Sequence, residues 1–228
     1  MKVVSKILSD CARENGRDQA QVFTDFLDYL IGTFSVENIV SHKADIFSVL
    51  EEKRKEGSPF FPAMGEWIVK TDERIKIEGC FDFFGSLYEE MFLVKSKASN
   101  MGQFFTPMAL CRVMARCAMP ASLRRVNEPS CGSGRNVLAM FAESDKSKYQ
   151  YYICEDLDPV SVKMCTLNLM IHGMRGCVIC HDSLIPGSFH FGYEVNEVRY
   201  PFPVDAWSIR LITSAEYIKR TRSSKKEK

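Results

Sequence analysis

The chain has 228 residues, of which 46% are hydrophobic and 26% are charged, and its formal net charge at pH 7 is +1. These values are ordinary for a soluble protein, and the apolar content is enough to bury one core or one core and a small satellite domain. No window approaches the ~18 consecutive apolar residues of a membrane span, and the opening "MKVVSKILSD" lacks the sustained apolar run of a signal peptide. We therefore expect a cytoplasmic protein whose nine cysteines are reduced and mostly buried.

The balanced net charge hides a basic C-terminal end. Residues 219–228 hold six basic residues and one acid, so +5, which leaves −4 for the other 218 residues. Such an end is typical of a solvated, mobile tail, and contact with nucleic acid is the second interpretation. We predict a disordered basic tail over residues 214–228.

Residues 1–95 have the periodicity of a helical domain. The stretch 18–34 spaces its apolar residues by three and four, which places them on one helix face. This stripe consists of Val22, Phe23, Phe26, Leu27, Leu30 and Ile31. The stretch 35–57 repeats the pattern, with Ser35 as N-cap and Gly57 as the stop.

A further helix is predicted in 80–93, and the polar stretch 94–102 after it reads as a linker. This helix would bury Phe83, Phe84, Leu87, Tyr88 and Met91. Beyond the linker, strands and helices alternate. In order, the elements are a helix opened by Thr106-Pro107, a strand in "LRRVNEP", a helix in "RNVLAMFAES", a strand in "YQYYICEDLDP", a helix in "VSVKMCTLNLMIHG" and a strand in "GCVIC". This order predicts an α/β domain over 100–213, with a parallel sheet and helices on both faces.

The stretch "VNEPSCGSGRN" (126–136) lies where such a sheet binds its ligand, after the first strand. Gly132 and Gly134 let the backbone approach a ligand where a Cβ would collide. The next helix offers free N–H groups and a positive dipole end to a carboxylate, and Glu128 can hold an ammonium group. The second strand ends in "EDLD", and an acid at the end of this strand is placed to take ribose hydroxyls. An amino-acid group beside a ribose describes S-adenosylmethionine better than NAD.

The stretch "CVICH" (177–181) matches the Cys-x-x-Cys-His pattern of covalent haem attachment. That attachment needs export, for which the sequence has no signal, and a zinc site would need further ligands at metal spacing. On a strand, Cys177 and Cys180 point to opposite faces. We predict buried strand cysteines, and neither haem nor a metal.

Four motifs appear in the order found in N6-adenine DNA methylases. They are "GQFFTP" (102–107), "NEPSCGSG" (127–134), "EDLDP" (155–159) and "HDSL" (181–184). The chain resembles most closely the modification (M) subunit of type I restriction-modification systems, over roughly residues 80–185. The segment "DFFGSLYEEMF" (82–92) is similar to the helical segment before the catalytic domain in that family. The resemblance implies a truncated Rossmann-like, S-adenosylmethionine-dependent methyltransferase sheet behind the helical domain.

The resemblance also implies the cofactor contacts. The methionine end would lie against Gln103, Phe104, Phe105, Thr106, Pro107, Glu128, Pro129, Cys131, Gly132 and Gly134. Glu128 stands where the family usually has Asp. Asp156 would bind the ribose, Leu157 would pack on the adenine ring, and Asp182 would accept a hydrogen bond from the adenine amino group. The alternatives are a surface acid at Glu128, a helix-start charge at Asp156 and a loop cap at Asp182.

The family's catalytic motif, Asn/Asp-Pro-Pro-Tyr/Phe after strand four, is missing. In that motif, Asn and a Pro carbonyl accept hydrogen bonds from the amino group of a flipped adenine, and the aromatic ring stacks on the base. The chain has no Pro-Pro pair and no Asn followed by Pro, and Tyr200-Pro201-Phe202 is a weak match. The approach "YEVNEVRY" is more polar than a buried parallel strand, and "AWSIRLI" (206–212) is a better one. A short sheet would need a cover on its edge, either the helical domain or a second chain.

We therefore expect a DNA N6-adenine methyltransferase-family protein that binds S-adenosylmethionine and contacts DNA, as a subunit of a restriction-modification system. The first alternative is a non-catalytic S-adenosylmethionine-binding pseudo-methyltransferase that acts as a regulatory or assembly partner. The second is a methyltransferase for another substrate with a different acceptor site.

Overall fold

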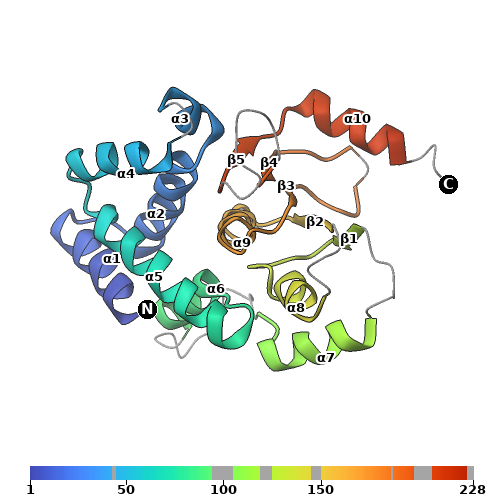
Figure 1. Ribbon diagram of the computed structural model, residues 1–228, viewed down its shortest axis with the longest axis horizontal. Helices are drawn as coiled ribbons and strands as arrows, with labels where there is room; N and C mark the ends of the chain where they lie inside the picture. Colours follow the sequence, from blue (N-terminus) through green and yellow to red (C-terminus); the bar gives the residue numbers. More distant parts are fainter. Residues whose placement is uncertain are drawn as a thin grey trace.

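A group of helices lies beside a five-stranded sheet, and helix α9 (Pro159–Ile171) runs between the two parts (Figure 1). This computed structural model describes residues 1–42, 45–93, 105–118, 125–144, 150–185, 187–197 and 207–224, with side chains to Lys219 in the last range. Residues 164–171 of α9 are all buried, because α9 packs on the N-terminal helices and on the sheet. A helix buried on every side is mostly apolar, and the buried Thr166 and Asn168 of α9 are hydrogen-bonded.

The N-terminal part is helical, as predicted. Its elements are α1 (Lys2–Glu14), α2 (Gln19–Thr33), α3 (Val36–Ser41), α4 (Ile46–Lys55), α5 (Phe60–Glu78), α6 (Phe83–Tyr88) and the π-helical turn η1 (Glu89–Leu93). The predicted apolar stripe on α2 is buried in full. The predicted helix over 35–57 is instead two helices. Ser35 caps α3 as expected, and Asp45 starts α4 anew by accepting from the N–H of Phe47 (3.0 Å).

The sheet has the strand order β1-β2-β3-β4-β5. Its strands are β1 (Arg125–Glu128), β2 (Tyr151–Asp156), β3 (Gly176–Cys180), β4 (Phe191–Val195) and β5 (Ile209–Leu211). The first three pair in parallel, as predicted, whereas β4 and β5 pair antiparallel. The expectation of a wholly parallel sheet is therefore wrong at β4, which runs opposite to β1–β3, while β5, antiparallel to β4, runs in the same direction as β3. Only residues 181–190 separate β3 from β4, and a parallel return needs a crossover of about a dozen residues or more.

Helices cover both faces of the sheet. α8 (Arg135–Glu143) and α9 lie on one face, and α7 (Met108–Ala118) packs on α8. On the other face lies α10 (Ser214–Ser224), within the segment for which the sequence predicts a disordered tail. Tyr217 explains this difference, because it is 5% exposed and its ring stacks on Phe189 with centroids 4.7 Å apart.

The helical part covers the outer edge of β5. The N–H of Ile209 donates to the carbonyl of Phe34 (2.9 Å), and Trp207 packs edge-on against the Phe34 ring (6.0 Å). One of the two covers expected for the sheet edge is thus present. The main apolar core also runs without a break from α1 and α2 to β2, β3 and β4. The division into domains at 1–95 and 100–213 stays a prediction.

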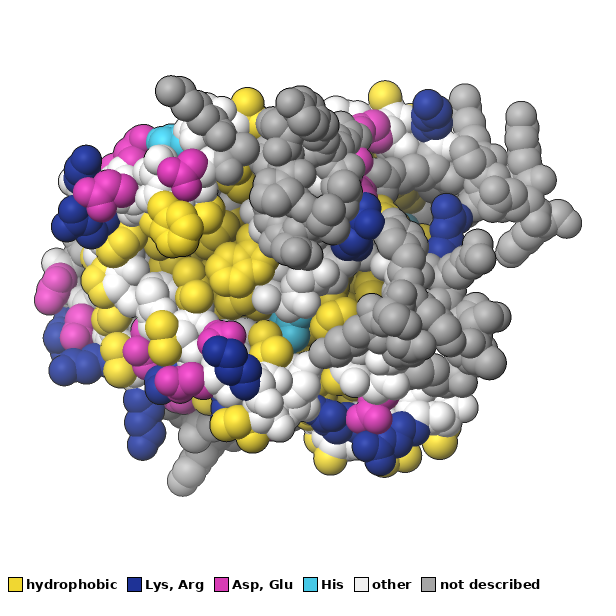
Figure 2. All heavy atoms as spheres, viewed as in Figure 1, with side chains coloured by type: hydrophobic (Ala, Val, Ile, Leu, Met, Phe, Trp, Pro, Cys, Tyr) yellow, Lys and Arg dark blue, Asp and Glu magenta, His cyan; other side chains and the backbone are white. Residues whose placement is uncertain are grey.

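Hydrophobic side chains gather in a band over the helical part beside α9 on the face seen in Figure 2. An apolar hollow of about 390 Å³ lies where α5 meets the end of α9, with Val69, Ile171 and Trp207 among its lining residues. No helix in the described part of the chain is both long and apolar enough to span a membrane.

Candidate functional site

The glycine turn joins β1 to α8. The chain leaves β1 at Glu128 and enters α8 at Arg135, with Gly134 as the N-cap. Gly132 and Gly134 have φ angles of +53° and +95°, a region that side-chain-bearing residues rarely adopt. The N–H of Gly134 donates to the carbonyl of Cys131 (2.8 Å), so the turn is closed by its own backbone. Because α8 starts here, its free N–H groups and positive dipole end lie at this turn.

The acid at the end of β2 holds the turn in place. Asp156 accepts the N–H of Gly132 on Oδ2 (2.8 Å) and the N–H of Asp158 on Oδ1 (2.9 Å). The N–H of Cys131 donates to the carbonyl of Glu155 (2.9 Å). Each oxygen of Asp156 uses one lone pair in these bonds and keeps another. The half-buried carboxylate can therefore support the turn and also accept hydrogen bonds from a ligand.

A cavity of about 240 Å³ lies between the turn and the end of β2. Its lining residues are Phe105, Thr106, Ser130, Cys131, Gly132, Ser133, Arg135, Asn136, Asp156 and Ser161. Five of the predicted site residues thus share one cavity, although they come from three separate motifs. Sequence reasoning missed Ser130, Ser133, Arg135, Asn136 and Ser161. Four of these lie within the turn or the first turn of α8, and their position beside the two glycines was the available signal.

Glu128 and Asn136 form a pair beside the cavity. Asn136 donates from Nδ2 to Glu128 Oε2 (3.2 Å), and its buried Oδ1 has no hydrogen-bond partner among the described residues. A buried acceptor without a donor is costly, and a ligand that brings N–H groups would satisfy it. The pair supplies one charged and one neutral acceptor, which is the complement of an ammonium group.

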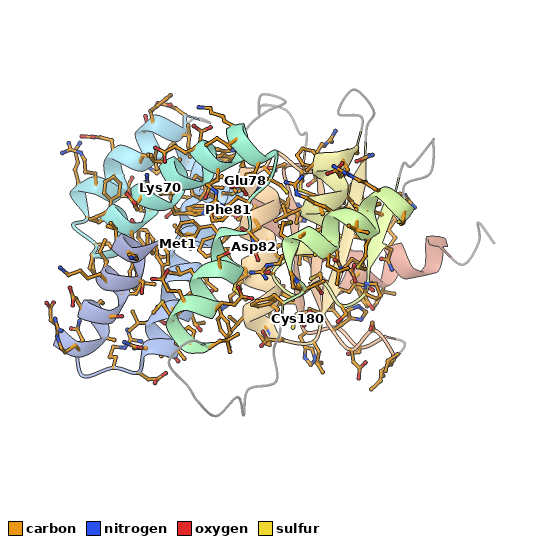
Figure 3. The ribbon with its side chains drawn as sticks, turned by 90° about the horizontal axis from the view of Figure 1, so that it is seen from below. Met1, Lys70, Glu78, Phe81, Asp82 and Cys180 are labelled. Atoms are coloured by element: carbon orange, nitrogen blue, oxygen red, sulfur yellow. The ribbon has the colours of Figure 1, made fainter. Side chains whose placement is uncertain are left out.

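A buried carboxylate from the helical part reaches the turn from behind. Asp82 is the N-cap of α6 and is 2% exposed. Its oxygens accept from the N–H of Gly85, Ser133 Oγ, Arg135 Nε and Asn168 Nδ2, at 2.6–2.8 Å. Figure 3 shows Asp82 in the middle of the molecule, where the helical part meets the sheet part. One carboxylate thus joins α6, the glycine turn and α9.

Arg135 completes this cluster. Its Nη1 and Nη2 donate to the two carboxylate oxygens of Glu89, at 3.0 and 2.8 Å. Burial lowers the pKa of the Arg135 guanidinium, but the hydrogen bonds and charges of Glu89 and Asp82 outweigh it and raise the pKa above its ordinary value. The guanidinium also lies 5.3 Å from the centre of the Phe105 ring. Arg135 is therefore a fixed cation in the cavity wall.

The two glycines differ in what a side chain would meet. A Cβ at Gly132 would lie 3.2 Å from the ring of Phe105, which lines the cavity. A Cβ at Gly134 would lie 3.0 Å from Cys165 Sγ, in the core below the turn. The expectation that a Cβ at Gly134 enters ligand space is therefore wrong, because its vector points into the protein.

Thiols fill the core below the turn. Cys131, Cys154 and Cys165 are each at most 6% exposed. Burial raises the pKa of the Cys165 thiol well above its ordinary value, so this cysteine stays protonated and packs as an apolar group. Cys177 and Cys180 are buried in β3 and belong to cores on opposite faces of the sheet, as predicted. In the described part of the chain, no cluster of three or more potential ligands is arranged to hold a metal ion.

The remaining predicted residues either lie around the cavity or fall outside the residues that the structure describes. Pro107 and Pro129 are exposed next to lining residues. Leu157 is 61% exposed just beyond β2, and Asp182 lies just beyond β3. Asp182 Oδ1 accepts the N–H of Leu184 (2.9 Å), which is the loop-cap alternative. Gln103, Phe104, Tyr200, Pro201 and Phe202 fall outside the described residues.

The fold is that of an α/β protein with a cavity at the carboxyl ends of its parallel strands, where open α/β sheets bind ligands. A sequence model described as "N-6 DNA Methylase" matches residues 80–217. Because this match covers more than half of the chain, the chain belongs to the N-6 DNA methylase family. No solved structure matches the chain.

The similar curated proteins are methylase subunits of type I restriction enzymes. The chain is 27% identical over 113 residues to the "Type I restriction enzyme EcoEI methylase subunit" of Escherichia coli, which covers 45% of this chain and 23% of the relative. It is 29% identical over 101 residues to the MpnII methylase subunit of Mycoplasma pneumoniae, covering 41% and 18%. It is 23% identical over 117 residues to the MjaVIII methylase subunit of Methanocaldococcus jannaschii, covering 49% and 20%. The chain therefore spans about a fifth of the length of these relatives.

Proposed function

We propose that the chain binds S-adenosylmethionine in the cavity beside the glycine turn and acts on DNA as a methyltransferase-family subunit. One observation carries the proposal: Arg135 and Asn136, at the start of α8 where a helix has free N–H groups, line the same cavity as the half-buried Asp156. This arrangement suits a ligand that is anionic at one end and has vicinal hydroxyls at the other. The family and the curated relatives give the ligand and the substrate class.

The residues present fit the cofactor. The start of α8 would receive the carboxylate, and Glu128 and Asn136 would receive the ammonium group. Asp156 would accept hydrogen bonds from the ribose hydroxyls on its free lone pairs. The cavity of about 240 Å³ is smaller than the 300 Å³ or more typical of ligand pockets. The adenine ring would therefore extend past Asp156 to the edge where Leu157 and Asp182 lie.

When bound, the cofactor supplies an electrophilic methyl group on a sulfonium. The chain's own residues would fix the two ends of the cofactor and so aim that methyl group. Cys131, 6% exposed, excludes water from the floor of the turn. We propose Tyr200, Pro201 and Phe202 as the candidates for contact with the target base, since they are the weak sequence match to the family's catalytic motif.

A second candidate function is that of a non-catalytic partner that binds S-adenosylmethionine. The observation in its favour is the missing acceptor pair: the sequence has no Asn followed by Pro and no Pro-Pro pair. β4 also runs antiparallel next to β3, so it does not bring its carboxyl end to the edge that holds the cavity. Removing a well-aimed acceptor in a dry site typically costs about 10²–10³-fold in rate. We propose that this chain by itself methylates adenine slowly or not at all.

Tritiated methyl transfer to mixed-sequence DNA at saturating cofactor tests this. The assay compares the chain alone with the chain plus the other subunits of a type I restriction enzyme, the assembly named in its relatives. Transfer that appears only with the partners supports an enzyme subunit. No transfer in either case, with S-adenosylmethionine still bound, supports the non-catalytic partner. Rapid transfer by the lone chain contradicts the expected slow rate and identifies Tyr200-Pro201-Phe202 as a working motif.

A further inference from the structure

The segment before the cofactor turn makes charged contacts that a mere linker does not need. Gly85 is the third residue of α6. A Cβ at this position would collide with the Asp82 carboxylate and the Ser133 hydroxyl. Asp82 in turn accepts four hydrogen bonds, two of them from Ser133 and Arg135 of the glycine turn. This close approach is built into α6 and directed at the turn.

Glu89, about two helical turns beyond Asp82, extends the same contact with Arg135. It lies at the start of the π-helical turn η1, a geometry that is rare and often found at functional sites. Its carboxylate makes a two-point contact with Arg135, which gives orientation as well as energy. Its side chain is 34% exposed, so the ion pair lies at the border between the core and the solvent.

The segment also supports the opposite wall of the cavity. The Phe105 ring, which lines the cavity, packs edge-on against Tyr88 with ring centres 5.9 Å apart. Arg135 Nη1 lies 3.5 Å from the carbonyl of Thr106, another lining residue. The two walls of the cavity are therefore joined through Arg135 and the segment of Asp82 to Glu89.

We propose that Asp82 and Glu89 are positioning residues of the cofactor site, which fix the glycine turn in the shape that receives the amino-acid end of the cofactor. This proposal rests on the proposed function. The guanidinium of Arg135 is engaged by Asp82 and Glu89 on all three of its nitrogens, so it holds the turn and leaves the cofactor carboxylate to the backbone of α8. The residues that form the cofactor site then begin at Asp82. This agrees with the family match, which starts at residue 80.

The test uses two ligands that share the adenosine and differ at the amino-acid end. S-adenosylmethionine has this end on a positive sulfonium, and methylthioadenosine lacks it and is a neutral thioether. We expect Glu89→Gln to weaken S-adenosylmethionine about tenfold, because one charge-assisted contact to Arg135 is lost. Methylthioadenosine should keep its affinity within about twofold, because Asp156 is untouched. Glu90→Gln is the matched control, since it removes the same charge from the next residue, and it should change neither affinity.

Asp82→Asn is the second variant and should act in the same direction with a larger loss. Thermal unfolding without ligand separates a general loss of stability from a positioning effect. If Glu89→Gln weakens both ligands equally, or neither, the positioning role is overturned. If the unmodified chain binds neither ligand, the proposed function itself fails, which is a different result from failure of the variants alone.

Discussion

In the parallel half of the sheet, β1 to β3, the strand ends meet at one edge with the glycine turn and a cavity, whereas in the antiparallel half, β4 and β5, polar side chains pair with one another. Glu194 of β4 accepts a hydrogen bond from Tyr151 of β2 (2.6 Å), and Arg210 of β5 contacts Glu197 and Glu216 at 3.1 and 3.0 Å. Asn136 Oδ1, beside the parallel strands, is a buried acceptor without a donor among the described residues, whereas Glu194, Glu197 and Glu216 have partners within the protein.

The difference shows how strand direction decides where a site can form. Parallel strands bring their carboxyl ends to the same edge, so the turn after Glu128 meets Asp156 there. β4 runs antiparallel to β3 and brings its amino end to that edge instead, whereas β5, antiparallel to β4, again points the same way as β3. β5 attaches the sheet to the helical part through Phe34, and neither strand contributes a residue to the cavity lining.

Substitution in the core below the turn should have the largest effect on stability. Gly134→Val places a β-branched side chain at φ +95° and pushes it toward Cys165. Strain and overpacking together should cost about 3 kcal/mol or more, and lower the melting temperature by about 10 °C. Gly173→Val is the control, because Gly173 has φ +67° but open space around it, and it should cost clearly less. Equal melting temperatures for the two variants would contradict the packing described here.

Removal of the acid in the parallel half should have the largest effect on the ligand. Asp156→Ala loses the two charge-assisted bonds proposed for the ribose and the support of the Gly132 N–H. S-adenosylmethionine affinity should fall by on the order of 3 kcal/mol, which is about 100-fold. Calorimetric titration measures this. If the affinity is unchanged, either Glu155 contacts the ribose in place of Asp156 or no ribose binds at this position.

A smaller effect is expected at the amino-acid end. Asn136→Ala removes the unpaired acceptor Oδ1 and the support of Glu128. We expect about a tenfold loss for S-adenosylmethionine, equal to about 1.4 kcal/mol, and no change for methylthioadenosine. Asn127→Ala, on the exposed face of β1, is the control. Equal losses for both ligands would show that Asn136 supports the fold rather than the ammonium group.

The smallest effect is expected in the antiparallel half, and it depends on pH. The hydrogen bond from the Thr213 N–H, with help from Arg210, lowers the pKa of Glu216 to about 2. A lowered pKa means that Glu216 stabilises the fold above its ordinary pKa of 4.5 and loses this contribution as the pH falls toward 2. Because the side chain is 35% exposed, Glu216→Gln should cost only about 1 kcal/mol at pH 7.

Urea unfolding at pH 7, 5 and 3 should show the stability difference between Glu216→Gln and the unmodified chain shrinking below pH 4.5. S-adenosylmethionine affinity at pH 7 should stay the same. If the stability difference does not change with pH, the Glu216 charge does not stabilise the fold. If Glu216→Gln lowers the affinity for S-adenosylmethionine, the two halves of the sheet are not independent.

The sequence was sufficient for the elements of the parallel half because their signals are local. Asp158-Pro159 marks the start of α9, Gly173 marks its end, and the glycines mark the turn before α8. The contact of Asp82 with Ser133 is not predictable in this way, because the two residues lie 51 positions apart. The sequence around Asp82 predicts only that it caps the helix that follows it.

The direction of β4 and the helix at the C-terminal end were also beyond the sequence pattern. Tyr193 and Glu194 make this stretch too polar for a buried parallel strand, and β4 is antiparallel to β3, a direction that the local pattern does not predict. Tyr217 is one aromatic residue in a basic segment, and its contacts with Phe189 and His181 explain why α10 packs on the sheet. Long-range partners decided both outcomes.

Isothermal titration of the 228-residue chain with S-adenosylmethionine tests the central claim most directly. If the parallel half holds a cofactor site, binding is saturable with one site per chain, and Asp156→Ala weakens it about 100-fold. Binding that does not saturate, or that is the same for both chains, would contradict the assignment of the cavity beside Asp156 as the cofactor site.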